Sequence, residues 1–505
     1  MRRLMATLGV AVIVVSCGGG GGASPSTGGV TPTGTAAVPA ATPTTAAVEP
    51  TTAAVEPTGT PSAESPTPGA TTGGVTPSES AAAATPVVTP AITQPPAVVL
   101  TDYCASSGAS PAPGSPAPSG GVNAWAAGIS GPVTISGWQS TGAEGDALTQ
   151  TLCAAQAALP NLQITYQPVA DYVPAMTANI AARDVPDLFY VNADYAQSWI
   201  DNTYLLQLDN YISTASFDTS QFYPGYASIF QNSAGNWFGF PKDGNTIGMA
   251  YNSDIVKTPP TTLTDLVTWA KSAKGKGSYK APLCLNAGLD RGLAFLYAEG
   301  GAVVSDDGKT DMIDSDASKK AVQWYMDLFK DGLGMTASDM GDGWCGDALG
   351  KGDAAVIFEG GWLDPAMTST YPTVKYAWAT VPTGSTKKPV TISFTVSYSI
   401  GADAKNPDQA FALLTYLTGP VGMQVWTQGG VALPSRKDVP APPGKDVLTA
   451  ESAYAKPGSG FMPGWGDVQS AFQNAFIDQI QKKSFDAGPV IAATKTAVDK
   501  ALSGP

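Results

Sequence analysis

The sequence predicts an α/β protein built of two lobes. Beyond residue 130, short apolar runs typical of strands alternate with runs that have helical periodicity. This alternation is typical of a doubly wound α/β layer, in which helices cover a mostly parallel sheet. Residues 131–505 contain too many alternations for one core, and roughly 375 residues are enough for two cores. We therefore expect two doubly wound α/β lobes.

The first predicted lobe begins with strands and helices in strict alternation. Residues 187–191 are nearly all apolar, as expected for a strand whose sheet is covered on both faces. Ligands of such sheets bind beyond the carboxyl ends of the strands, so segments 139–144 and 192–195 are expected near a site. The predicted order is strand, helix, strand, helix, strand, at 133–138, 145–159, 162–167, 172–182 and 187–191.

The rest of the chain continues the pattern and ends in two helices. Thr262 or Thr264 is expected to cap the helix that begins at residue 263. One more helix is expected to end at 347–349. The predicted strands are 246–252, 282–285, 354–358 and 393–400, and the other predicted helices are 263–272, 318–330, 407–417, 421–428, 467–482 and 488–502.

The first 17 residues have the order of a secretory signal. Arg2 and Arg3 precede an apolar run that is too short to span a bilayer, and small residues follow it. The segment Val14–Cys17 resembles a bacterial lipobox. This resemblance implies that residues 1–16 are a signal peptide that is removed, and that a diacylglycerol is attached to Cys17. The alternative is an ordinary signal with a chance cysteine.

Residues 17–130 are expected to be a lipidated cysteine followed by a disordered tether. From residue 18 the segment consists mainly of Pro, Thr, Ala, Gly, Ser and Val, lacks Lys and Arg, and repeats TTAAVEP in tandem at 44–57. Such a composition buries too little apolar surface to offset chain entropy. The protein is therefore expected to act outside the cell while tied to a membrane.

Charge and histidine content exclude several functions. A net charge of −14 and a pI near 4.4 argue against nucleic-acid partners and against binding to anionic lipid through a basic patch. The chain has no histidine, which excludes Ser-His-Asp and Cys-His catalysis and histidine-ligated metals. No cysteine pair has metal-site spacing. We therefore expect no metal and no cofactor.

Four cysteines remain besides Cys17, and an even number outside the cell indicates disulfides. Three pairings are possible. We favour Cys284 with Cys345, because both fall in one predicted lobe, which leaves Cys104 with Cys153. Buried free thiols are the alternative.

Three stretches carry a family resemblance. They are PDLFYVNAD at 186–194, GFPKDGNTIGMAYN at 239–252 and GDAAVIFEGGW at 352–362. Together, in this order, they resemble the extracellular solute-binding proteins of family 1, the maltose-binding-protein-like components of ABC importers. The resemblance implies a type II periplasmic-binding-protein-like fold, with a hinge between the lobes. One lobe would hold about 131–243 and 392–432, and the other about 248–388 and 436–505.

The same resemblance implies a function. The protein would capture a mono- or oligosaccharide by hinge closure and deliver it to the permease subunits of an ABC importer. It would be a lipid-anchored monomer on the extracellular face of the membrane or in the periplasm, and not an enzyme. A solute such as a polyamine is an alternative ligand, because aromatic rings and carboxylates also bind cations.

An extracellular glycoside hydrolase is a less favoured alternative. It needs two carboxyl groups about 5–9.5 Å apart. The folded part has four glutamates and many aspartates, but no strand series typical of a β/α barrel. The glutamates are Glu144, Glu299, Glu359 and Glu451.

Sugar chemistry selects the candidate ligand-binding residues. Flat aromatic rings cover the apolar faces of a sugar, and carboxylates, amides and Arg bind its hydroxyl rim. The family motif supplies a stacking aromatic at Trp362, for which a core position is the alternative. The candidates lie at strand ends, in glycine-rich loops or near the predicted crossings: Trp138, Ser140, Glu144, Asp194, Tyr195, Asp243, Asn245, Trp344, Glu359, Trp362, Arg436 and Trp465.

Several of these candidates have a structural alternative. Asp194 could be a helix N-cap, the pair Asp243 and Asn245 could form a turn, and Arg436 could make an interlobe salt bridge. Trp465 is expected in an exposed loop. The other tryptophans are assigned to packing: Trp125, Trp199, Trp269, Trp324, Trp378 and Trp426.

Overall fold

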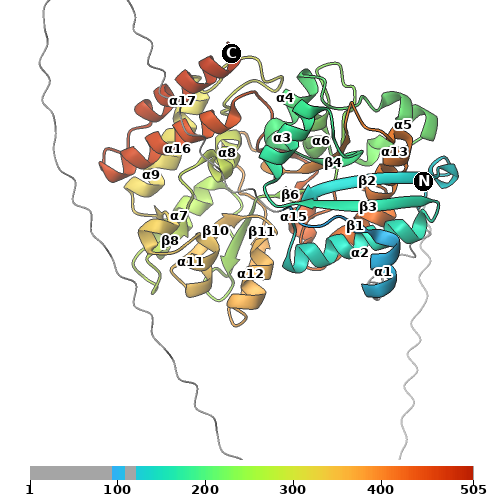
Figure 1. Ribbon diagram of the computed structural model, residues 1–505. Coiled ribbons are helices and arrows are strands. Elements are labelled where there is room, and N and C mark those ends of the chain that lie inside the picture. Colours follow the sequence, from blue (N-terminus) through green and yellow to red (C-terminus); the bar gives the residue numbers. More distant parts are fainter. Residues whose placement is uncertain (1–93, 108–120, 504–505) are drawn as a thin grey trace, which may run out of the picture. The chain divides into compact units, whose positions relative to one another are not determined.

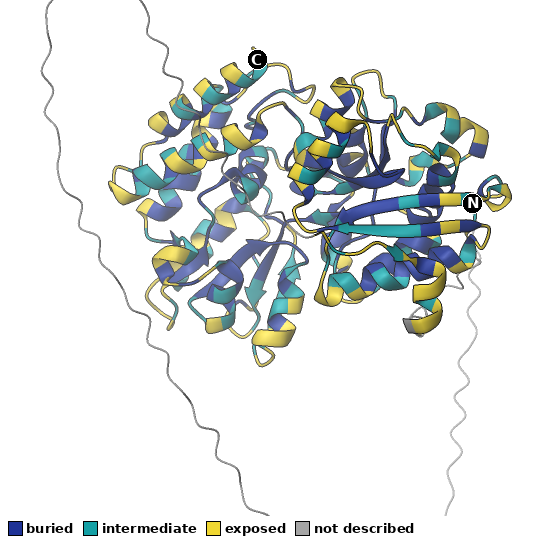
Figure 2. Ribbon diagram, in the orientation of Figure 1, coloured by how far each residue is buried: buried dark blue, intermediate teal, exposed yellow. Residues whose placement is uncertain are grey.

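A computed structural model describes residues 94–107 and 121–503, and the predicted fold class is confirmed within them. Two separate sheets, each packed against helices, form two lobes (Figure 1). Buried strands lie inside each lobe, and the helices turn their exposed faces outward (Figure 2). The described residues include no helix with the length and apolarity needed to span a bilayer. The predicted signal peptide, Cys17 and the tether segments 18–93 and 108–120 lie outside the described residues.

Lobe 1 is built on a six-stranded sheet in the order β1-β3-β2-β4-β13-β5. Strand β2 runs parallel to β3 and β4, whereas β13 returns antiparallel to β4 from far along the chain. The register places Trp138 opposite Val169, so β2 and β3 end together. The strands are β1 (Val98–Val99), β2 (Gly131–Trp138), β3 (Leu162–Val169), β4 (Leu188–Asn192), β5 (Phe240–Pro241) and β13 (Val396–Ile400).

The helices of lobe 1 bury their apolar faces against this sheet. Ile135, Ile164 and Phe189 are fully buried in one core with Leu148 and Leu152 of α2. The helices are α1 (Leu100–Ser107), α2 (Gly142–Ala158), α3 (Tyr172–Ala182), α4 (Ala193–Asp201), α5 (Asp209–Ala215), α6 (Pro224–Ala227), α13 (Pro407–Leu417) and α14 (Pro420–Thr427), with short 3-10 turns η1 (Ala126–Gly128), η2 (Thr219–Gln221) and η3 (Ser228–Phe230).

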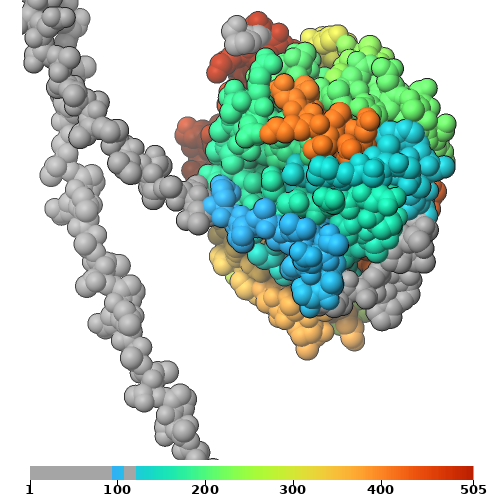
Figure 3. All heavy atoms as spheres, turned by 45° about the vertical axis from the view of Figure 1, so that its right-hand side comes forward, coloured from blue at the N-terminus to red at the C-terminus, as the bar shows by residue number. Residues whose placement is uncertain are grey.

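The prediction of a disordered tether up to residue 130 is wrong for residues 98–107 and for the turn η1, whose Ala126 lies in the core. Strand β1 adds to the edge of β3, and helix α1 packs on α2 and β3. Leu100 is buried in the core, and Cys104 bonds to Cys153 of α2 with an S–S distance of 1.96 Å. Figure 3 shows this blue segment lying against the surface of lobe 1. A short apolar run and one cysteine hold this segment against lobe 1. The prediction missed them because it was based on the average composition of the whole tether.

Lobe 2 is built on a five-stranded sheet in the order β11-β7-β10-β8-β9. Strands β8, β9 and β10 are parallel, and β7 runs antiparallel to β10. Thr262 caps α7 by accepting a hydrogen bond from Asp265 N at 3.0 Å. The strands are β7 (Gly248–Asn252), β8 (Ala281–Cys284), β9 (Gly334–Met335), β10 (Ala354–Glu359) and β11 (Tyr376–Ala379).

The helices of lobe 2 include four that the sequence patterns did not predict. These are α8, α10, α12 and α15, three of which are shorter than nine residues. The predicted second disulfide is present, with Cys284 and Cys345 at an S–S distance of 2.03 Å. The helices are α7 (Leu263–Ala273), α8 (Leu289–Ala298), α9 (Asp316–Lys330), α10 (Ala337–Met340), α11 (Cys345–Lys351), α12 (Leu363–Thr370), α15 (Asp446–Glu451), α16 (Trp465–Gln481) and α17 (Ala487–Leu502).

A small third sheet joins the lobes. Its strands are β6 (Asn245–Thr246), β12 (Thr391–Phe394) and β14 (Ala455–Pro457), in the order β14-β12-β6. The single strands predicted at 246–252 and 393–400 therefore each break in two. The chain leaves the joining sheet at Ile247 and at Thr395 and enters the sheet of a lobe, although the apolar pattern runs on without a break.

The contacts of residues 433–438 bear on the lobe boundary predicted at about residue 436. Leu433 and Gly244 exchange backbone hydrogen bonds, and Lys437 N donates to Gln221 O at 2.8 Å. Arg436 forms a bridge with Phe222 of lobe 1. Residues 433–438 therefore belong to lobe 1, and the chain passes to lobe 2 only after them.

Candidate functional site

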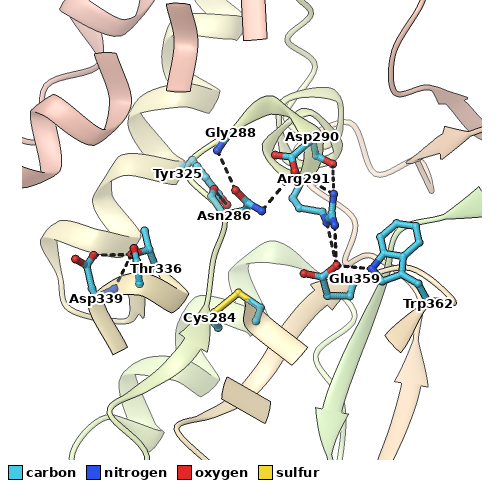
Figure 4. Close-up of a disulfide and its surroundings, with 12 residues drawn as sticks. Cys284, Asn286, Gly288, Asp290, Arg291, Tyr325, Thr336, Asp339, Glu359 and Trp362 are labelled. Carbon is cyan, nitrogen blue, oxygen red and sulfur yellow. Dashed lines mark hydrogen bonds and ion pairs between the residues drawn. A yellow bond between two sulfur atoms is a disulfide. The ribbon is translucent and has the colours of Figure 1, made fainter. Parts of the chain in front are cut away.

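Strand β10 ends in the most highly connected group among the predicted residues. Glu359 is 3% exposed, and its Oε2 accepts hydrogen bonds from Arg291 Nε at 3.1 Å and Arg291 Nη2 at 2.8 Å. Trp362 Nε1 donates to the same oxygen at 2.9 Å (Figure 4). No described residue donates to Oε1 of Glu359. The carboxylate therefore fixes an arginine and an indole in one arrangement, with one oxygen left over.

Arg291 lies in the first turn of α8, which follows β8, the strand parallel to β10. Its guanidinium centre lies 4.9 Å from the centroid of the Trp362 ring, and Nη1 also pairs with Asp290 Oδ2 at 3.1 Å. Burial raises the pKa of Glu359 above its ordinary value, and the charge and hydrogen bonds of Arg291 oppose that rise. The positive charge of Arg291 is therefore already matched by protein carboxylates.

The loop that carries Trp362 is held by close packing at Gly360 and by Lys445. A Cβ atom on Gly360 would lie 2.4 Å from the Trp362 ring, so the ring can approach the backbone only because residue 360 is glycine. Lys445 Nζ donates to Gly361 O at 2.6 Å and pairs with Asp364 Oδ2 at 2.5 Å. Lys445 is 2% exposed and lies just before α15, so a residue far along the chain positions the indole.

Strand β2 of lobe 1 ends in a second group of predicted residues. Trp138 Nε1 donates to Glu144 Oε1 at 3.0 Å, and the Trp138 ring packs edge-on against Tyr190 with centroids 4.7 Å apart. Trp138 remains half-buried. The structure thus brings together two candidates, an indole and a carboxylate, at the carboxyl end of the sheet.

Three predicted residues have a buried polar side-chain atom without a partner in the described part of the chain. These atoms are Ser140 Oγ, after β2, Tyr195 Oη, in α4, and Asn245 Oδ1, in β6. Asn245 Oδ1 lies 3.0 Å from the position that a Cβ atom of Gly361 would occupy, which places it beside the Trp362 loop. A buried polar atom without a partner costs free energy that a ligand hydroxyl group would recover.

Asp194 and Tyr195 begin α4, directly after β4. Asn192, not Asp194, is the N-cap, because Asn192 Oδ1 accepts a hydrogen bond from Asp194 N at 3.1 Å. The Asp194 carboxylate is exposed and makes no hydrogen bond or ion pair with the described residues. Tyr195 packs on Trp199 with ring centroids 4.5 Å apart, and burial raises the pKa of Tyr195 to about 12. Asp194 is thus free to meet a ligand, whereas Tyr195 is partly committed to packing.

Asp243 is held by two residues that sequence reasoning did not place in the site. Its Oδ2 accepts hydrogen bonds from Lys242 Nζ at 2.9 Å and Trp426 Nε1 at 2.8 Å. Lys242 Nζ also lies 3.5 Å from the Trp426 ring centroid and 5.2 Å from that of Tyr190. Because Tyr190 touches Trp138, these contacts connect the end of β2 to the first crossing between the lobes.

The structure contradicts the expectations for Arg436 and Trp465. Arg436 pairs with Asp438 of the same segment at 2.8 Å and lies over the Phe222 ring at 5.2 Å, so it makes no interlobe bridge. Trp465 is 1% exposed at the start of α16, where it packs on Phe461 in the core of lobe 2. The glycines around Trp465 suggested an exposed loop, but the chain here enters a helix whose first residue is buried. Trp344 is the N-cap residue of α11 and is half-buried.

A cavity of about 1,160 Å³ lies between α4 of lobe 1 and segments 306–309 and 457–463 of lobe 2. None of the predicted site residues lines it, and its lining contains no tryptophan. The indole-bearing groups at the strand ends are therefore the better candidates for a sugar site. Within the described residues, no group of three or more Cys, Asp and Glu side chains could hold a metal ion.

Sequence reasoning missed Arg291, Lys242 and Lys445 as members of the site. Arg291 had a usable signal, because it lies only a few residues after the strand predicted at 282–285, where a ligand-binding loop is expected. Lys242 and Lys445 had no such signal, since each acts through contacts between segments far apart in sequence.

Comparisons with known proteins agree with the two-lobed fold. The family model of bacterial extracellular solute-binding proteins matches residues 139–424. The GacH receptor of Streptomyces glaucescens, solved unliganded and with acarbose, is 21% identical, with a TM-score of 0.61 and coverage of 74% of this chain and 99% of that chain.

Two other solved structures are similar in fold. An ABC substrate-binding protein from Listeria monocytogenes in complex with cycloalternan is 18% identical, with a TM-score of 0.61 and coverage of 74% of this chain and 99% of that one. The sugar-binding protein MalE from Xanthomonas citri is 16% identical, with a TM-score of 0.64 and coverage of 74% and 97%.

Proposed function

Because the chain belongs to the family of bacterial extracellular solute-binding proteins, we propose that it captures a carbohydrate between its two lobes and delivers it to an ABC importer. The observation that carries the proposal is the fixed group of Glu359, Arg291 and Trp362. It offers an indole for the apolar face of a sugar and a carboxylate oxygen for a hydroxyl group.

The charges at the site favour a neutral guest. Arg291 is paired with Glu359 and Asp290, Lys242 with Asp243, and Lys445 with Asp364. An anion would meet no free cation among these groups. The ligands in the titles of the similar structures, acarbose and cycloalternan, are saccharides and support the same ligand class.

The mechanism is hinge closure. A ligand that touches lobe 1 at Ser140 or Asp194 and lobe 2 at Trp362 binds the closed arrangement better than the open one. The ligand therefore shifts the population toward the closed form. The closed protein then docks on the permease subunits, whose ATPase partner supplies the energy.

The remaining elements of the proposal concern placement. A diacylglycerol on Cys17 and a long tether would keep the domain on the outer face of the membrane, or in the periplasm, as a monomer. Two or more acyl chains anchor a protein far better than one, at about 0.8 kcal/mol per buried CH₂.

Titration of the purified protein tests the ligand class. The probes are neutral oligosaccharides of increasing length from starch, cellulose, xylan and chitin, with spermidine as the alternative ligand and tryptophan fluorescence as the readout. We expect a saturable change with one sugar series, at a Kd near 1 μM or about −8 kcal/mol. A response to spermidine alone would favour a polyamine. Release of reducing ends from a bound sugar would favour a glycoside hydrolase.

A further inference from the structure

Residues 94–107, here called the attachment segment, lie on lobe 1 and take no part in the proposed sugar site. Val98 and Val99 add β1 to the outer edge of β3, and Ala170 N, just beyond that strand, donates to Gln94 Oε1 at 3.2 Å. Helix α1 then packs on α2 and β3 (Figure 3). The strand pairing, the helix packing and the disulfide bond of the attachment segment are therefore all made with lobe 1.

The attachment segment is held mainly by one covalent bond. Leu100 is the only buried residue among the side chains described there, whereas Val99 and Tyr103 are 48% and 40% exposed. A two-residue strand and one buried leucine give little resistance to pulling, because each hydrogen bond contributes only modestly to stability. Cys104, however, is bonded to Cys153, which is buried in α2. A chain that is pulled from its N-terminal side can therefore straighten only as far as Cys104.

The disulfide bond closes a loop that contains much of the sugar-binding face of lobe 1. Cys104 and Cys153 are 49 residues apart in sequence. Strand β2 and the start of α2 lie between them, together with the candidates Trp138, Ser140 and Glu144. Strand β2 is also a central strand, with β3 on one side and β4 on the other. Without the bond, a pull from the N-terminal side would enter the sheet along β2, the strand that carries Trp138 at its other end.

We propose that the attachment segment fastens the predicted tether to lobe 1, so that a pull on the tether passes through Cys104 to α2 and bypasses β2. The sugar-binding residues within the closed loop then carry none of this load. The inference rests on the anchorage that is part of the proposed function, but it does not depend on the identity of the ligand.

The same bond keeps the domain attached when the chain is cut. Residues 108–120 consist only of Gly, Ala, Ser and Pro, and connections made of small residues are preferred sites of proteolytic nicking. A cut there leaves the two pieces joined, because Cys104 and Cys153 lie on opposite sides of it in sequence. The domain therefore leaves its anchor only when the disulfide bond is also reduced.

Cleavage on beads tests the attachment. The chain from Gly18 onward carries an N-terminal biotin and is bound to streptavidin beads, and a thrombin recognition sequence replaces residues 111–116. After thrombin treatment and washing, we expect nearly all of the protein to stay on the beads and dithiothreitol to release it. Cys104→Ser/Cys153→Ser should lose most of the protein on cleavage. Cys284→Ser/Cys345→Ser removes the other disulfide, and as the matched control it should behave like the parent protein.

A force measurement on the Cys284→Ser/Cys345→Ser chain tests the path of the pull. With handles at residues 18 and 505, unfolding should release less chain in the oxidised than in the reduced protein. The difference should be roughly 160–180 Å, the extended length of the 49-residue span. Equal lengths in the two states would show that the pull runs through β2.

Three results on the beads would also overturn the attachment. They are release by thrombin alone, retention of the cut parent protein in dithiothreitol, and equal retention of Cys104→Ser/Cys153→Ser and the parent after cleavage. The first two need no cysteine variant, so the test holds even if that variant misfolds. The beads replace the membrane and no sugar is added. Failure of the attachment would therefore leave the sugar site intact, and failure of lipidation or of sugar binding would leave the attachment intact.

Discussion

The two lobes present unlike faces at the ends of their strands. On lobe 2, Glu359, Arg291 and Trp362 are tied to one another, and Lys445 fixes the loop behind them. On lobe 1, Trp138 pairs with Glu144, and Asp243 accepts hydrogen bonds from Lys242 and Trp426 at the first crossing between the lobes. Two other candidates there, Ser140 and Asp194, lack partners among the described residues.

This difference indicates that the two lobes contribute to ligand binding in different ways. The face of lobe 2 is organised before a ligand arrives, so little ordering entropy opposes binding there. The face of lobe 1 holds polar groups that only a guest can satisfy. Lobe 2 is therefore expected to supply most of the binding free energy. The contacts that the ligand makes with lobe 1 are expected to stabilise the closed form relative to the open form.

The largest expected effect is the loss of stability when Arg291 is removed. Arg291→Met leaves Glu359 buried without its cation and should lower the free energy of unfolding by about 3–5 kcal/mol. Urea denaturation at pH 7 measures it. Arg183→Met is the matched control, because Arg183 is 81% exposed and its ion pair with Asp403 spans 3.7 Å. Equal destabilisation by the two variants would show that the face of lobe 2 is not specially organised.

Removal of the stacking indole should have the largest effect on sugar binding. Trp362→Ala deletes the aromatic face and should weaken sugar binding by about 2–3 kcal/mol, or roughly 30- to 150-fold. Trp362→Phe, which keeps an aromatic face but not the hydrogen bond to Glu359, should lie between the variant and the wild-type protein. Calorimetry with the sugar that binds best gives both values. Unchanged affinity in Trp362→Ala would move the site away from β10.

The free energy of unfolding should depend on pH through a buried carboxyl group in α15. Burial raises the pKa of Glu451 in α15 to about 8 from an ordinary value of 4.5, although Val381 N donates to its Oε1 at 2.9 Å. The folded state therefore holds this proton where the unfolded state releases it, and stability falls as pH rises from about 4.5 to about 8.

Glu451→Gln should remove the loss of stability that accompanies the rise in pH. Relative to the wild-type protein, the variant should gain stability across this pH window by up to about 4 kcal/mol. Thermal unfolding at pH 5, 6, 7 and 8 measures the difference between the two proteins. A difference that stays constant with pH would show that Glu451 ionises normally.

The smallest expected effect concerns Ser140 of lobe 1. Ser140→Ala deletes a buried hydroxyl group without a partner, so the ligand-free protein should be as stable as the wild-type protein or slightly more stable. Sugar affinity should fall by about 1 kcal/mol, because a hydrogen bond to the ligand is lost. Denaturation and calorimetry on the same variant separate the two effects. A loss of stability without a loss of affinity would assign Ser140 to the fold.

The strands and long helices could be predicted from the sequence because each depends on local periodicity. The helix predicted at 145–159 is observed as Gly142–Ala158, and the strand at 354–358 as Ala354–Glu359. The predictions failed where the chain changes sheet, at Ile247 and Thr395. No local pattern records which sheet a strand joins.

The site could be predicted only in part, for the same reason. Glu359 and Trp362 follow a strand directly, and the pattern placed both beside its end. The partners that fix them, Arg291 and Lys445, lie 68 and 84 residues away from Glu359 and Gly361 in sequence. Trp465 shows the opposite error, because flanking glycines suggested a loop where the structure has a buried helix start.

Hydrogen–deuterium exchange with and without the sugar that binds best tests the central claim most directly, because it reads both lobes at once. We expect slower exchange in the segments 138–145 of lobe 1 and 359–364 of lobe 2, with no change in α7. Protection confined to one lobe would contradict capture of the sugar between the two lobes. Protection confined to the cavity between α4 and segments 306–309 and 457–463 would contradict it as well.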